Sequence, residues 1–71
     1  MQQQEPLEIF WDAILSREPD QIVKAFQPLD PDSRRRTLVH LRRMAEEEGW
    51  QSMQRISALA ALDALQPFLK A

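Results

Sequence analysis

The sequence contains no cysteine and no tyrosine, and only one histidine and one glycine among its 71 residues. The absence of cysteine excludes a disulfide framework, and with His40 as the lone histidine it also argues against a structural zinc site. A single glycine is too few for a glycine-rich phosphate-binding loop. A domain of this length has a small core and marginal stability. We therefore expect it to depend on well-packed helices or on association with another chain.

Long apolar runs are also missing. No stretch approaches the roughly 20 apolar residues that span a bilayer, since even the run from Ile56 to Leu65 is interrupted by Asp63. Residues 1–5 contain neither the basic nor the apolar part of a secretion signal. We expect a cytoplasmic protein without a membrane segment. The net charge of −2 argues against bulk electrostatic binding to nucleic acid or to anionic membranes.

What the sequence does contain is typical of helices separated by prolines. Leucine, alanine, glutamate, glutamine and arginine dominate, and no segment shows the alternation of a strand. We predict an all-α fold, a compact bundle of four short helices at about 6–16, 19–27, 31–48 and 52–66. Short connections favour antiparallel neighbours. These helices form a single domain over residues 6–71, preceded by a disordered tail at 1–5.

Several helix ends carry local sequence signals. Asp30 followed by Pro31 is a typical helix start, with the aspartate as capping residue and the proline in the first turn. Gly49 is predicted to adopt the left-handed conformation after the third helix, with Trp50 folding back onto that helix. Ser52 is expected to cap the fourth helix, and Pro67 to kink or end it.

The fourth predicted helix is apolar almost all round. At about 100° per residue, its two opposite sides hold different sets: Met53, Ile56, Ala60 and Ala64 on one, and Leu62, Leu65 and Leu69 on the other. We assign the first set, which includes small residues, to the intramolecular core. The second set, with the nearby Phe68, is predicted to be an exposed contact surface for another chain.

The third predicted helix has an unusual order of charges, with arginines at its start and glutamates at its end, the reverse of what the helix dipole favours. The charged contact face comprises Arg35, Arg36, Arg42, Arg43, Glu46 and Glu47. Three interpretations remain open. The face is simply solvated, or two copies meet across a twofold axis and pair arginine with glutamate, or the arginines contact DNA phosphates. The interleaved glutamates and the small number of lysines argue against nucleic acid.

The residues that catalysis requires are not arranged for it. No serine has a general base at a suggestive spacing, and Thr37 stands where a Glu-x-x-His metal motif ending at His40 would need glutamate. The aromatic residues are assigned to the core, although a ligand cavity lined by Trp11 and Trp50 is an alternative. We therefore predict no enzymatic activity, no cofactor, no metal and no small-molecule substrate.

The functional prediction is a small, non-enzymatic protein–protein interaction module. We expect it to self-associate through its C-terminal helix as a homodimer, or to bind another protein with the same surface. The alternative is a small DNA-associated regulator that uses the arginine-rich third helix.

Overall fold

The computed structural model describes residues 6–69, and the regular structure in this part of the chain is entirely helical. The helices are α1 (Pro6–Ile14), α2 (Pro19–Phe26), α3 (Pro31–Glu46), α4 (Ser52–Ala64) and the single turn α5 (Gln66–Leu69). The predicted all-α bundle of four short helices is confirmed, while α5 was not predicted. The proposed tail at 1–5 lies outside the described residues.

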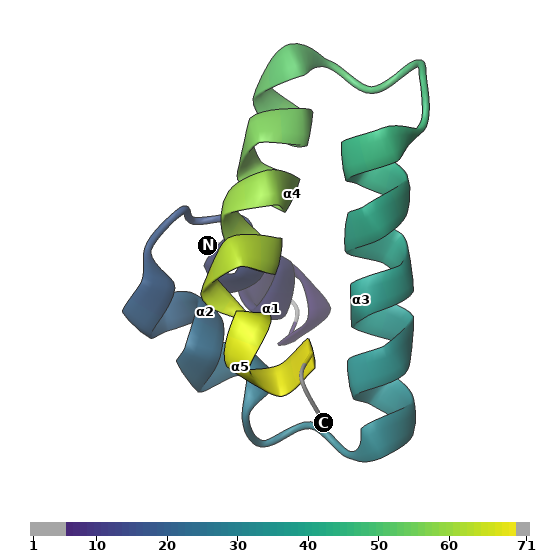
Figure 1. Ribbon diagram of the computed structural model, residues 1–71. Coiled ribbons are helices and arrows are strands. Elements are labelled where there is room, and N and C mark those ends of the chain that lie inside the picture. Colours follow the sequence, from purple (N-terminus) through teal and green to yellow (C-terminus); the bar gives the residue numbers. More distant parts are fainter. Residues whose placement is uncertain (1–5, 70–71) are drawn as a thin grey trace.

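The helices are not packed equally closely. α3 and α4 run antiparallel and form the most extensive contact, and α2 packs against both α1 and α4 (Figure 1). α1 lies behind α4 in that view and packs mainly against α2. α1 and α3 are not among these closely packed pairs.

Capping fixes where the two long helices begin. The Asp30 carboxylate accepts a hydrogen bond from the Ser33 backbone N–H at 3.4 Å, and Pro31 occupies the first turn, as predicted. The cap of α4 is Gln51 rather than Ser52. Gln51 and Gln54 form a reciprocal capping box, in which the Gln51 N–H donates to Gln54 Oε1 at 3.0 Å.

The helix ends lie up to two residues inside the predicted ones. After α1, Ser16 Oγ donates to the carbonyl of Ala13 at 2.7 Å and accepts from the Glu18 N–H at 3.2 Å, and Arg17 adopts a left-handed conformation with φ of 65°. Gly49 has φ of 99°, which confirms the conformation predicted for it. α4 ends two residues before the 66 that the sequence suggested, and Pro67 lies within α5.

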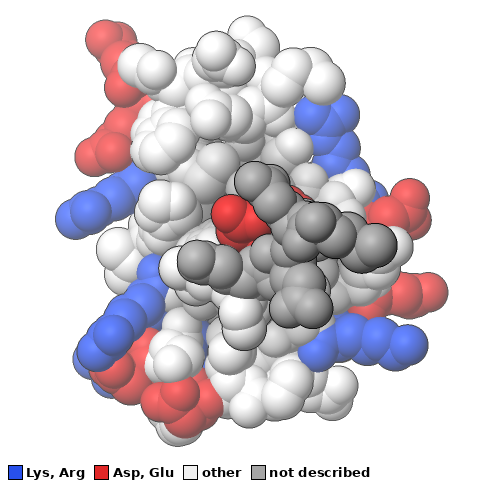
Figure 2. Space-filling view, turned by 180° about the vertical axis from the view of Figure 1, so that it is seen from behind, with Lys and Arg blue, Asp and Glu red and all other residues white. Residues whose placement is uncertain are grey.

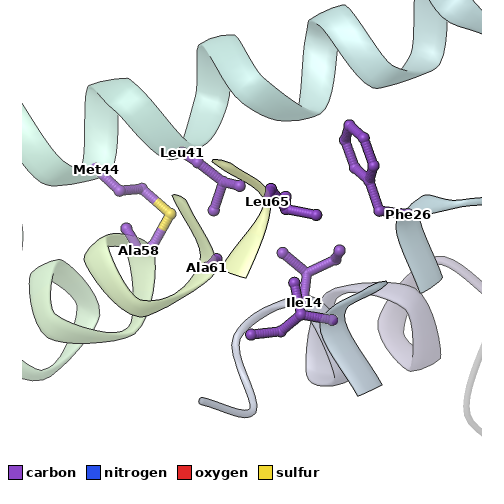
Figure 3. Packing of buried hydrophobic residues seen from close by; sticks show 8 residues of the cluster. Ile14, Phe26, Leu41, Met44, Ala58, Ala61 and Leu65 are labelled. Carbon is purple, nitrogen blue, oxygen red and sulfur yellow. The ribbon is translucent and has the colours of Figure 1, made fainter. Parts of the chain in front are cut away.

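The core draws on all four longer helices. Its buried hydrophobic residues are Ile14, Ile22, Phe26, Leu41, Met44, Ala58, Ala61 and Leu65. Figure 3 shows Leu41 and Met44 of α3 pointing toward α4 at the two alanines, with Leu65, Ile14 and Phe26 to the right of them. Small residues at the contact allow two helices to approach closely. The α3–α4 pair is thus built around the alanines of α4.

This packing reverses the predicted orientation of α4. Leu65, predicted to be exposed, has 0% exposure, whereas Met53 and Ile56 are 60% and 48% exposed. Leu59, which neither predicted set included, is 52% exposed. The prediction was wrong because both sides of the helix are apolar, so that hydrophobicity alone does not distinguish them. Each side also holds two alanines, and those that α4 buries in the core are Ala58 and Ala61 rather than Ala60 and Ala64.

Arg34 joins three elements at one end of the bundle. Its guanidinium carbon lies 5.5 Å from the ring centroid of Phe26 and 5.4 Å from that of Phe68, and the two rings are themselves 5.1 Å apart. The Arg34 side chain also donates to the carbonyl of Gln27 at 2.5 Å. The start of α3 is therefore held to the end of α2 and to α5.

Two more arginines anchor loops to α4. From the α1–α2 turn, Arg17 donates to Ser57 Oγ at 3.0 Å and to the carbonyl of Met53 at 3.2 Å. Arg55 donates to the carbonyl of Glu47 at 2.8 Å, just beyond the end of α3. Arg17 thus donates to one hydroxyl and one backbone carbonyl, and Arg55 to one backbone carbonyl.

Leu65 and Leu59 provide a matched pair of substitutions on one helix. Because Leu65 is fully buried and Leu59 half exposed, Leu65→Ala should lower the free energy of unfolding by about 2–5 kcal/mol. The same change at Leu59 should cost less than about 1 kcal/mol. Urea denaturation followed by circular dichroism measures both. Equal losses at the two positions would contradict the orientation of α4.

The cap at Asp30 makes the stability of α3 depend on pH. The hydrogen bonds from Ser33 lower the pKa of the Asp30 carboxyl below its ordinary 3.8, against a smaller opposing effect of desolvation. Its contribution is therefore complete above the unfolded pKa and is lost as the pH falls through the lower folded pKa. Asp30→Ala should thus destabilise the protein more at pH 7 than at pH 2. Asp30→Asn, which keeps an acceptor that does not titrate, is the control in urea titrations at both pH values.

Candidate protein-interaction surfaces

A groove of about 520 Å³ lies between α1 and α3. Its α1 wall is formed by Pro6, Leu7, Phe10 and Trp11, and its α3 wall by Ser33, Arg36, Thr37 and His40, with Leu29 from the α2–α3 connection. Leu7 is 65% exposed. Most of the lining is apolar, and the polar groups lie on one side only. A volume of this size is within the range of about 300–1,000 Å³ that is typical of ligand-binding sites.

Aromatic side chains support the α3 wall of the groove. The His40 ring lies between two tryptophans, 4.9 Å from Trp11 and 5.9 Å from Trp50 by ring centroids, and both contacts are edge-to-face. Phe10 extends the row through its own contact with Trp11 at 5.2 Å. Both tryptophans pack partly against the core, as predicted. Trp11 lines the groove as well, whereas Trp50 reaches it only through His40.

The groove adjoins a smaller basic hollow of about 280 Å³. The hollow is lined by Arg35, Arg36, Val39, His40 and Arg43, so that Arg36 and His40 belong to both depressions. Arg36 forms an ion pair with Asp32 at 2.8 Å, one turn earlier on α3. Its side chain is 80% exposed, and such a surface pair contributes little to stability and is easily exchanged. The guanidinium groups around the hollow are therefore available to carboxylates of a partner.

All six residues of the predicted charged face are exposed along α3. The structure gathers three of the arginines around the hollow and leaves Arg42 outside it. Within the described residues, no ion pair joins Arg42 to Glu46 or Arg43 to Glu47. A twofold arrangement that sets Arg35 and Arg36 against Glu46 and Glu47 places the axis near the middle of α3. Arg42 of both copies then lies beside that axis, so repulsion offsets part of the attraction.

The predicted hydrophobic contact surface is not exposed as expected. Leu65 is buried in the core, Phe68 packs against Phe26, and Leu62 and Leu69 are half-buried. The apolar side chains that α4 does expose lie on its other side. We call Met53, Ile56 and Leu59 the α4 stripe. Ser52 and Ala60 flank the stripe. The next charged residue along the same side of the helix is Asp63, one turn after Leu59.

Charge is distributed unevenly over the molecule. Figure 2, seen from behind, shows lysine, arginine, aspartate and glutamate side chains mostly along the two lateral edges, with uncharged surface in the upper middle.

Of the groove residues, the sequence assigned Phe10 and Trp11 to the core, with a cavity lined by Trp11 and Trp50 as the alternative, and it did not identify Leu7 as part of a site. Within residues 6–69, no three histidine or acidic side chains gather closely enough to hold a metal ion. In the same range, no helix has both the length and the apolar character that crossing a bilayer requires.

Comparison with known proteins adds no family to this description. No protein-family model matches the chain, and neither a curated protein nor a solved structure is significantly similar to it. The functional argument therefore depends on the surfaces themselves.

Proposed function

We propose that the chain is a non-enzymatic protein–protein interaction module that forms a homodimer through the α4 stripe. The observation that carries the proposal is the exposure of three large apolar side chains in a row. Met53, Ile56 and Leu59 are 60%, 48% and 52% exposed, although the core of the bundle is complete without them. Withdrawing such side chains from water is favourable, at about 25 cal/mol per Å².

None of the three side chains of the stripe is charged, which favours a second copy as the partner, and the Arg17 guanidinium lies at one end of the stripe, 3.8 Å from Met53 Sδ. In a twofold contact each residue meets the same surface on the other copy. A charged residue close to the axis would then face its own counterpart, whereas the α4 stripe sets apolar groups against apolar groups. The small Ala60 beside Ile56 leaves room for a second helix to approach.

The size of the stripe supports a weak dimer. An interface of standard size buries about 1,600 Å² in total, and a contact centred on three side chains per copy is smaller. We expect dissociation at micromolar concentrations rather than an obligate dimer. The DNA-associated alternative depends on the exposed arginines of α3 alone, and no further feature of the described residues favours it.

Ile56→Glu tests the proposal. Because each dimer contains the substitution twice, the dissociation constant should rise about a hundredfold. Analytical ultracentrifugation over a range of concentrations measures it, with circular dichroism to verify the helical fold. Val39→Glu is the control, since Val39 is similarly exposed, at 43%, but lies on α3.

Salt provides a second criterion. An apolar contact should be unchanged or strengthened at 1 M sodium chloride, whereas a contact built on the arginines and glutamates of α3 should weaken. A wild-type protein that remains monomeric at millimolar concentration, or a dimer that Ile56→Glu leaves intact, would overturn the proposal.

A further inference from the structure

We propose that the groove between α1 and α3, together with the basic hollow beside it, binds an acidic amphipathic helix of another protein. The partner presents leucine or aromatic side chains to the groove and carboxylates to the arginines of the hollow. This surface is separate from the α4 stripe, and the inference does not depend on self-association.

The first argument is that the seam between α1 and α3 has room for another helix. The two helices are not among the closely packed pairs of the bundle, and the groove between them measures about 520 Å³. Its α1 wall is apolar, and Leu7 at its edge is 65% exposed. A hydrophobic groove between two helices is a common docking site for the apolar face of an amphipathic helix.

The second argument is the charge beside the groove. Arg35, Arg36 and Arg43 surround the hollow, which shares Arg36 and His40 with the groove. The acidic residue paired with this set is Asp32, which contacts Arg36 at 2.8 Å. The basic residues therefore exceed the acidic ones, and an acidic flank on the partner gives electrostatic complementarity. A partner helix with an apolar face and an acidic flank contacts the groove and the hollow at the same time.

The third argument distinguishes a protein segment from a nucleic acid. The larger of the two depressions is mainly apolar, and the groups that could contact a phosphate are confined to its α3 wall, whereas its α1 wall suits only apolar side chains. The rings of Trp11 and His40 meet edge-to-face at 62°, an arrangement that secures the wall itself. The planar group of arginine donates two parallel hydrogen bonds to carboxylates and phosphates alike, so the apolar wall rather than the arginines makes the distinction.

A designed peptide tests the inference directly. The probe is an 18-residue helical peptide with leucine at positions i, i+3, i+4 and i+7 and glutamate on both flanks of that face. We expect saturable binding, followed by the intrinsic fluorescence of Trp11 and Trp50. A second peptide with lysine in place of every glutamate should bind at least tenfold more weakly.

Two matched pairs of variants locate the binding site. Leu7→Glu should weaken binding about tenfold, whereas Ile9→Glu, on the same helix but outside the groove and 53% exposed, should not. Arg43→Glu should weaken it about fivefold, whereas Arg42→Glu, outside the hollow, should have a smaller effect. Ile56→Glu should leave binding of the peptide unchanged, which keeps this result distinct from that of the α4 stripe.

Four results would overturn the inference. One is the absence of saturable binding up to about 1 mM peptide, and another is binding that Leu7→Glu and Ile9→Glu weaken equally. The third is a preference for a 20-base-pair DNA duplex over the acidic peptide, abolished by Arg43→Glu, which would assign the hollow to nucleic acid. A change of solution mass caused by Leu7→Glu, with peptide binding intact, would likewise overturn it and identify a second copy as the occupant.

Discussion

The close contact between α3 and α4 is the constraint on which the rest of the structure depends. It is built around Ala58 and Ala61, which present almost no side chain to the neighbouring helix. Because the helices meet at these alanines, Leu65 lies at the centre of the bundle among residues of α1, α2 and α3. The same rotation of α4 turns Met53, Ile56 and Leu59 toward solvent. The orientation of α4 against α3 thus determines both which residues of α4 are buried and which form the exposed α4 stripe.

The arginines of the chain divide into two groups with different roles. Arg17, Arg34 and Arg55 donate hydrogen bonds to backbone carbonyls and tie turns and helix ends together. Arg35, Arg36 and Arg43 instead surround an exposed hollow on α3. Neighbouring positions such as Arg34 and Arg35 differ in role because successive residues of a helix are about 100° apart. One faces the aromatic rings of Phe26 and Phe68, and the other faces solvent.

The fold was more predictable than the surfaces. The helices could be located from prolines, from the cap at Asp30 and from Gly49, since each of these acts over a few residues. The chain also revealed that α4 is too apolar for an ordinary surface helix. It did not reveal which side is outward, because both sides hold large apolar residues and the choice is made by the volume available against α3. The groove was hidden for a related reason, since Leu7 and Trp11 have the spacing of core residues.

The sequence by itself determined an all-helical chain, the positions of its helices, more apolar surface than a small core requires, and a concentration of arginines on the third helix of a chain whose net charge is −2. Those properties follow from local backbone preferences and from composition. Only the tertiary structure decided that the surplus apolar surface is the α4 stripe rather than Leu65 and its neighbours, and that the arginines of α3 adjoin a groove. Both outcomes depend on how closely helices that are separate in sequence can approach, which is set by the volumes of the side chains between them.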